Sequence, residues 1–178
     1  MTLNTTVLIG KPCDEKEVFM FCRELLNCPK DIPFTHDEDS IRNPGGIGLD
    51  AWLWINYDKD PKAHECDFEC DEDCYYAESP RHSGYSYVDV SFDTAYGFRG
   101  KDGESCSDLH AKLVYKLGEW LDSKDLPWKW QNEYTGEWFD RYDGLETLGN
   151  YHDKNVKEWF DNVVPMIMKS ALDSNEQS

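Results

Sequence analysis

The residues best suited to chemistry lie in the segment His64–Glu78, which reads HECDFECDEDCYYAE. Six of the nine residues in Glu65–Asp73 are carboxylates, and Cys66, Cys70 and Cys74 recur every four residues. Like charges at this density repel one another, so solvent, a bound cation or a basic partner must offset them. The segment therefore indicates binding, and the sequence leaves three kinds of binding open.

The first is docking of a basic or nucleic-acid-binding protein. Duplex DNA carries one charge per about 1.7 Å of its axis, and carboxylates spread along one face of a compact protein approach that spacing. A DNA-binding protein would then be occupied by an acidic decoy that is not an enzyme. The alternative is an acidic face that serves only solubility. The carboxylates predicted to bind the partner are Glu65, Asp67, Glu69, Asp71, Glu72 and Asp73.

The second is a zinc-stabilised structural or interaction module. On a helix, Cys66, Cys70 and Cys74 would lie along one stripe, and His64 completes a tetrahedral set of four ligands. His82 is an alternative fourth ligand. Structural zinc sites usually use two tight ligand pairs, which this spacing lacks. The alternative is a short helix that packs three small cysteines inward.

The third is a calcium loop, because acidic residues alternate through the segment. Position 6 of the twelve-residue pattern is Glu72, where the sharp turn requires glycine, so the match is partial. Six positions of the pattern do match. Positions 1, 3, 5, 7, 9 and 12 correspond, in this order, to Asp67, Glu69, Asp71, Asp73, Tyr75 and Glu78.

A metal-dependent phosphodiester hydrolase is a further hypothesis. Asp89 and Asp93 share one face of a predicted strand, and Asp50 lies within possible reach. The candidate bases, His110 and His152-Asp153, lie elsewhere in the chain, and carboxylates with a histidine can bind Mg²⁺ or Mn²⁺. Half-solvated strands ordinarily carry such residues. The sequence contains no P-loop, no G-x-S-x-G and no H-E-x-x-H motif.

The composition narrows the classes of partner. The 178 residues include 36 Asp and Glu against 18 Lys and Arg, for a net charge of −18. Such a surface repels nucleic acid and anionic membranes and attracts basic proteins. The N-terminus lacks a basic, apolar signal pattern, and no run reaches the ~18 apolar residues that a membrane span needs. We therefore expect a cytoplasmic protein with mostly reduced thiols.

Apolar periodicity predicts an α+β fold. We expect strands at Thr5–Ile9, Ile47–Tyr57 and Tyr85–Thr94, a loop over 29–46, and a hairpin over 128–139. Helices follow Asp14 and Ser105 or Ser107, and a last one starts near Asp153. This order favours an antiparallel sheet with helices packed mainly on one face. We expect one domain over 1–172 with an acidic, cysteine-rich insertion over 58–84, and a disordered tail over 173–178.

The stretch Leu126–Asp140 reads LPWKWQNEYTGEWFD and resembles a segment of small uncharacterised proteins from bacteriophages that infect actinobacteria. The resemblance covers fifteen residues and transfers no functional residue. It implies a virus-encoded protein that acts on host machinery in the host cytoplasm. Within this stretch, strand alternation favours core positions for Trp130 and Trp138.

The zinc hypothesis predicts about one equivalent of zinc in protein purified without chelator, because four ligands of this type bind the ion tightly. Elemental analysis measures it directly. A content well below one equivalent contradicts the hypothesis, and the variant Cys70→Ser is the control that should lose the metal.

Overall fold

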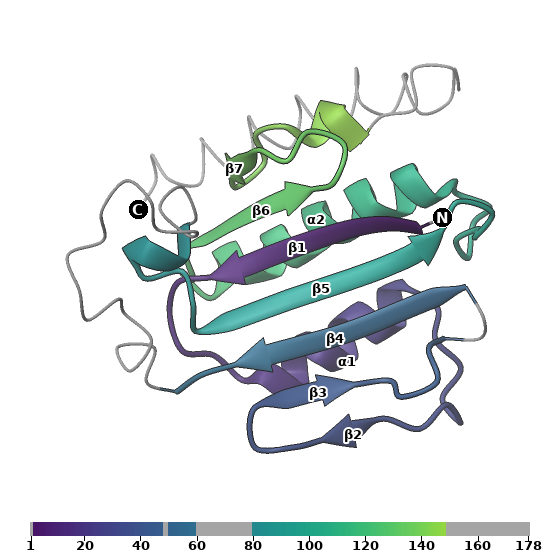
Figure 1. Cartoon of the computed structure of the whole chain (residues 1–178), viewed down its shortest axis with the longest axis horizontal. Helices are drawn as coiled ribbons and strands as arrows, with labels where there is room; N and C mark the ends of the chain where they lie inside the picture. Colours follow the sequence, from purple (N-terminus) through teal and green to yellow (C-terminus); the bar gives the residue numbers. More distant parts are fainter. Residues whose placement is uncertain (1, 48–49, 60–79, 149–178) are drawn as a thin grey trace.

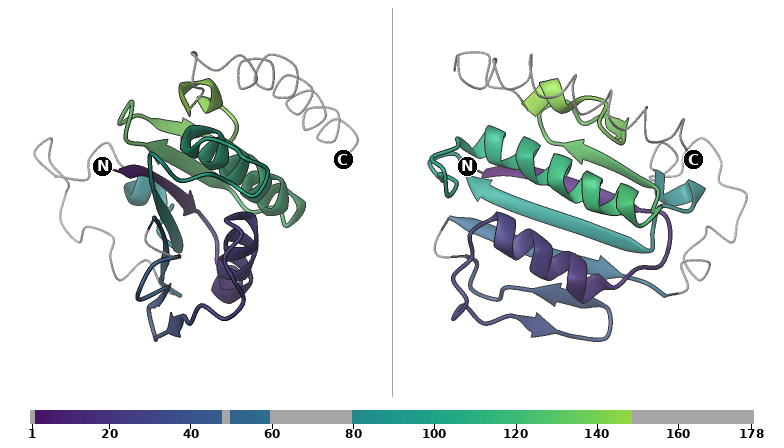
Figure 2. Two further views of the ribbon diagram at one scale, coloured as in Figure 1. Left: turned by 90° about the vertical axis from the view of Figure 1, so that its right-hand side faces the viewer. Right: turned by 180° about the vertical axis from the view of Figure 1, so that it is seen from behind.

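The computed structural model describes residues 2–47, 50–59 and 80–148, and it confirms the α+β class. In these ranges a seven-stranded antiparallel sheet has the order β2-β3-β4-β5-β1-β6-β7, and both helices cover one of its faces (Figures 1 and 2). The elements are β1 (Thr2–Ile9), α1 (Glu15–Leu25), β2 (Thr35–His36), β3 (Ser40–Arg42), β4 (Ala51–Tyr57), η2 (Pro80–Ser83), β5 (Val88–Ala95), α2 (Cys106–Ser123), β6 (Trp128–Asn132), β7 (Trp138–Asp140) and η3 (Leu145–Leu148).

The central part of the sheet is a split βαβ arrangement. Strands β4, β5, β1 and β6 lie side by side, and the chain visits them as β1-α1-β4 and β5-α2-β6. The β2–β3 hairpin is added between α1 and β4, and β7 extends the opposite edge. Helix α1 packs on β3 and β4, and α2 packs on β1 and β6.

Two sequence predictions require correction. The loop predicted over 29–46 contains the short strands β2 and β3, which alternation over two or three residues cannot reveal. The strand predicted to begin at Ile47 begins at Ala51 instead. Ile47 and Ala51 form an isolated antiparallel bridge, preceded by Gly46 at a φ of 75°. The chain therefore turns back on itself before β4 starts.

Both helices begin where capping chemistry places them. The Asp14 carboxylate accepts hydrogen bonds from the backbone N–H groups of Lys16 and Glu17, and the Ser105 hydroxyl accepts one from Asp108. The buried stripes of the helices, with Val18, Phe19, Leu113 and other apolar residues, meet the inward-facing side chains of the sheet in one core. No helix within the described ranges has the length and apolar character that crossing a membrane requires.

Neither α1 nor α2 covers the other face of the sheet, although Arg81 of η2 pairs with Asp89 there. We call it the open face, and its three central strands present Asn4, Thr6, Leu8, Trp52, Trp54, Asn56, Asp89, Ser91 and Asp93 there. Trp138 belongs to this side, because it pairs with Gln131, and it is only half-buried. Trp130 is fully buried on the helix side, so the core prediction is right for Trp130 and wrong for Trp138.

A histidine joins three elements inside the core. His110 of α2 is fully buried, with Nδ1 at 2.7 Å from the Thr5 hydroxyl of β1 and Nε2 at 2.8 Å from the Thr94 hydroxyl of β5. A neutral imidazole offers one donor and one acceptor, so one threonine donates and the other accepts. Burial lowers the pKa of His110 to about 3, because no described acidic group is within hydrogen-bonding distance of the cation. His110 is therefore a structural residue rather than a catalytic base.

This burial predicts acid sensitivity. Below the ordinary histidine pKa of about 6.5, His110 binds a proton in the unfolded chain but not in the folded chain. The free energy of unfolding therefore falls as the pH falls. We expect His110 to account for a loss of about 2 kcal/mol between pH 6.5 and pH 5. Urea unfolding of the wild type and of His110→Gln at both pH values checks this. Equal pH dependence in the two proteins contradicts it, because the variant retains every other histidine.

Candidate functional site: the acidic edge

Strand register brings three distant parts of the chain to one end of the sheet. Val88 of β5 pairs with Ile9 on one side and with Tyr57 on the other, so β1 and β4 end in line. The chain turns from β1 into α1 at that end. The β2–β3 turn lies there too, because Ser40 pairs with Asn56 and the Tyr57 N–H donates to the Asp39 carbonyl at 3.0 Å.

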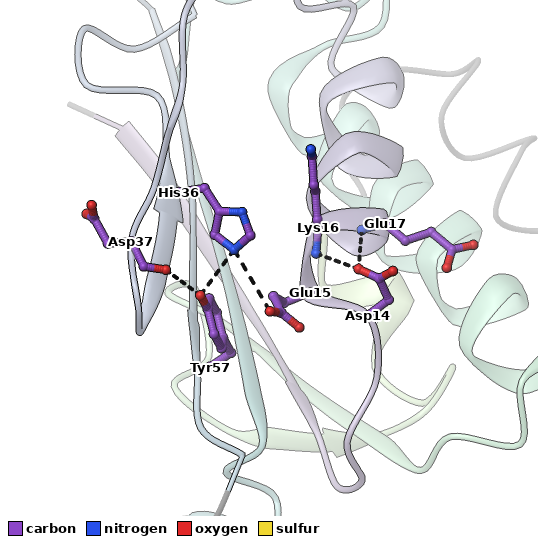
Figure 3. A network of polar contacts seen from close by, with 7 residues as sticks. All are labelled: Asp14, Glu15, Lys16, Glu17, His36, Asp37 and Tyr57. Carbon is purple, nitrogen blue, oxygen red and sulfur yellow. Dashed lines mark hydrogen bonds and ion pairs between the residues drawn. The ribbon is translucent and has the colours of Figure 1, made fainter.

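The segments at this end carry six carboxylates and also the exposed lysines Lys11, Lys16 and Lys59, none of whose ammonium groups lies within 4.0 Å of those carboxylates. We define the acidic edge as Asp14, Glu15 and Glu17 at the start of α1 together with Asp37, Glu38 and Asp39 in the β2–β3 turn. Glu15 is partly buried and the other five are exposed. Figure 3 shows Asp14, Glu15 and Glu17 on one side of His36 and Tyr57, and Asp37 on the other.

His36 and Tyr57 connect the two halves of the acidic edge. The Nε2 atom of His36 lies 3.1 Å from the Tyr57 hydroxyl and 3.9 Å from Oε1 of Glu15, and the Tyr57 hydroxyl donates to the backbone carbonyl of Asp37 (Figure 3). Burial first, and then the negative charge of Glu15, raises the pKa of the Tyr57 phenol. Tyr57 therefore remains a neutral hydrogen-bonding group at physiological pH.

The acidic edge lacks ion-paired basic side chains, as do other described carboxylates such as Glu24, Asp50 and Glu137. Elsewhere in the described ranges Asp89 pairs with Arg81 at 2.6 Å, Glu104 with Lys112 at 2.5 Å, and Asp122 with Arg141 at 2.8 Å. For the six carboxylates of the acidic edge, no described lysine or arginine lies within 4.0 Å. Asp14, Glu15 and Glu17 gain compensation instead from the positive end of the α1 dipole.

Buried Arg23 holds the hairpin against α1. Its guanidinium donates to the Asn43 side chain at 2.6 Å, to the Ile32 carbonyl at 2.7 Å and to the Pro29 carbonyl at 3.2 Å. It also stacks over the Phe34 ring at 5.2 Å. These contacts fix both the start and the end of the β2–β3 hairpin, and they set the distance between the two halves of the acidic edge.

The two sets of site residues predicted from the sequence lie outside the described residues. They are the partner-binding carboxylates Glu65, Asp67, Glu69, Asp71, Glu72 and Asp73, and the zinc ligands His64, Cys66, Cys70 and Cys74. The chain leaves the described part at Lys59, two residues after Tyr57, so this segment is joined to the sheet at the acidic edge. Among the described residues, no three His, Cys, Asp or Glu side chains are placed to hold a metal ion.

The carboxylates of the hydrolase hypothesis do not converge. Asp89 is held by Arg81, and Asp93 accepts a 2.6 Å hydrogen bond from the Asn4 amide. They are four residues apart on one strand, which separates them by about 13 Å. One metal ion cannot bridge that distance. His110, one candidate base, is buried on the opposite face of the sheet, and His152-Asp153 lies outside the described residues.

The acidic edge as a unit was missed from the sequence. The run Asp37-Glu38-Asp39 and the cap at Asp14 are both visible in the sequence, but nothing in it shows that they meet. Comparisons with protein-family models, with curated proteins and with solved structures give no match for this chain. The stretch Leu126–Asp140 forms the β6–β7 hairpin, at the opposite edge of the sheet.

The role of Arg23 predicts a large loss of stability on substitution. In Arg23→Met the carbonyls of Pro29 and Ile32 and the Asn43 side chain lose their buried donor, and we expect a destabilisation of about 3 kcal/mol. Exposed Arg42 of β3 provides the control, since Arg42→Met should change stability by less than about 0.5 kcal/mol. Urea unfolding of both variants measures the difference, and equal losses would show that Arg23 is not the anchor.

Proposed function

We propose that this protein is a non-enzymatic acidic binding protein that docks a basic or nucleic-acid-binding partner protein. The observation that carries the proposal is the acidic edge, with six carboxylates from two elements and no described lysine or arginine within ion-pair distance. A cationic surface placed against it gains the attraction that the protein's own side chains do not supply.

The distribution of charge supports a local docking surface. The described residues hold 23 of the 36 acidic side chains and 14 of the 18 basic ones, so half of the net charge of −18 lies within them. Several of the basic residues are engaged in ion pairs away from the acidic edge. The acidic edge therefore contributes six of the carboxylates that have no lysine or arginine within ion-pair distance in the described part.

The partner is defined by its charge. An anionic surface repels the phosphates of nucleic acid and of acidic lipids, so the partner is a protein with a lysine- or arginine-rich face. A DNA-binding protein offers such a face, and the acidic edge would compete with DNA for it. The resemblance of Leu126–Asp140 to bacteriophage proteins is compatible with a host protein as the target. The carboxylates of 65–73, predicted from the sequence to bind the same class of partner, lie outside the described residues.

Neutralising three carboxylates of the acidic edge tests the proposal. The variant Asp37→Asn/Glu38→Gln/Asp39→Asn should bind basic proteins captured from host lysate about tenfold more weakly at low salt, at about 0.5 kcal/mol per charge. High salt should remove most binding by the wild type as well. Captured proteins are identified by mass spectrometry and their affinities measured by calorimetry.

Two matched variants locate the surface. Glu24→Gln/Asp31→Asn/Glu137→Gln removes the same charge at exposed positions away from the acidic edge and should leave the affinity within about twofold. Asp71→Asn/Glu72→Gln/Asp73→Asn tests the segment predicted from the sequence. If all three variants lose the same affinity for the partner, the net charge of the protein explains the binding and the acidic edge is not the docking surface. Capture that is insensitive to salt would rule out electrostatic docking.

A further inference from the structure

We infer that His36 is a proton-operated clasp between the β2–β3 hairpin and the first turn of α1. The clasp is closed when the imidazole is a cation attracted to Glu15, and it loosens when the imidazole is neutral. The inference is independent of the proposed partner, because it concerns contacts within the protein and is measured on the protein alone.

The hydrogen bonds around Tyr57 decide which nitrogen of His36 titrates. The Tyr57 hydroxyl has a single proton, which it donates to the Asp37 carbonyl. Towards His36, 3.1 Å away, the same hydroxyl is therefore an acceptor, and Nε2 must be the donor. Nε2 keeps its proton in both charge states, so Nδ1 is the atom that gains and loses a proton.

With the proton on Nε2, the contact of His36 with Tyr57 is the same in both charge states of the ring, whereas its contact with Glu15 depends on the charge. The His36–Tyr57 hydrogen bond has the same donor and acceptor in both states. The contact between Nε2 and Glu15 Oε1, at 3.9 Å, is attractive as an ion pair only when the ring is charged. The side chain of Glu15 is 17% exposed and that of His36 37% exposed, so solvent screens the pair only in part.

Polar and charged groups face His36 from three elements. Glu15 faces it from α1, Tyr57 from β4, and the turn contributes Asp37, Glu38 and Asp39, while the paired position on β3 is the apolar Ile41. In Figure 3 the Lys16 side chain runs along α1, away from the ring. The imidazolium adds one positive charge between the two carboxylate groups of the acidic edge.

A double-mutant cycle on His36 and Glu15 tests the clasp. Unfolding by urea is measured at pH 5.5 and pH 8.5 for the wild type, His36→Gln, Glu15→Gln and the double variant. Glutamine at position 36 still offers a donor to Tyr57 but has no charge, and glutamine at position 15 retains the shape of glutamate. The contribution of His110 cancels, because all four proteins contain it.

We expect a coupling factor of about 2 to 5 in the unfolding equilibrium constant at pH 5.5, and a factor near 1 at pH 8.5, since the pair stabilises the fold only while the imidazole is charged. Nitrogen chemical shifts of His36 at pH 8.5 should show the proton on Nε2. Coupling that is equal at the two pH values, coupling absent at pH 5.5, or a neutral ring protonated on Nδ1 would each overturn the inference.

Discussion

The constraint on which the rest of this structure depends is the pairing of β5 with both β1 and β4. Because β5 is antiparallel to each of them, β1 and β4 run in the same direction and end together, with Ile9 and Tyr57 opposite the same residue, Val88. A chain that leaves β1 for a helix must then start that helix beside the end of β4. The meeting of α1 with Tyr57 follows from this register, and so does the acidic edge.

The structure handles its charge in two different ways. Some acidic residues have a basic partner, as Asp89 has Arg81 and Asp122 has Arg141. Those of the acidic edge have helix N–H groups and one histidine instead. Exposed carboxylates at a sheet edge cost little in isolation, because solvent screens them, whereas the same charges inside the sheet would need counterions. The unpaired charge of the acidic edge therefore remains available to another molecule.

Two buried groups keep this arrangement rigid. His110 ties α2 to β1 and β5 through two threonine hydroxyls, and Arg23 ties the hairpin to α1 through three acceptors. Both are polar residues inside an apolar core, where an unpaired group is costly. That cost enforces one geometry, since any slip of a strand or of the hairpin would leave a buried donor or acceptor without its partner.

The sequence alone determined the elements whose signals are local. Alternating apolar residues predicted β1, β4, β5 and the β6–β7 hairpin, and the caps at Asp14 and Ser105 located both described helices, because strand periodicity and capping depend on neighbouring residues. The same local signals implied an antiparallel sheet with helices on one face. They also showed that Asp37-Glu38-Asp39 is an acidic run.

Only the tertiary structure decided which of these residues meet. The strands β2 and β3 are too short to carry periodicity, and they exist because β4 offers an edge to pair with. Glu15, His36 and Tyr57 come from three elements, and their contact depends on strand order and register, which are set by long-range pairing and leave no trace in a single sequence. The acidic edge could not be predicted for the same reason, although each of its halves was visible.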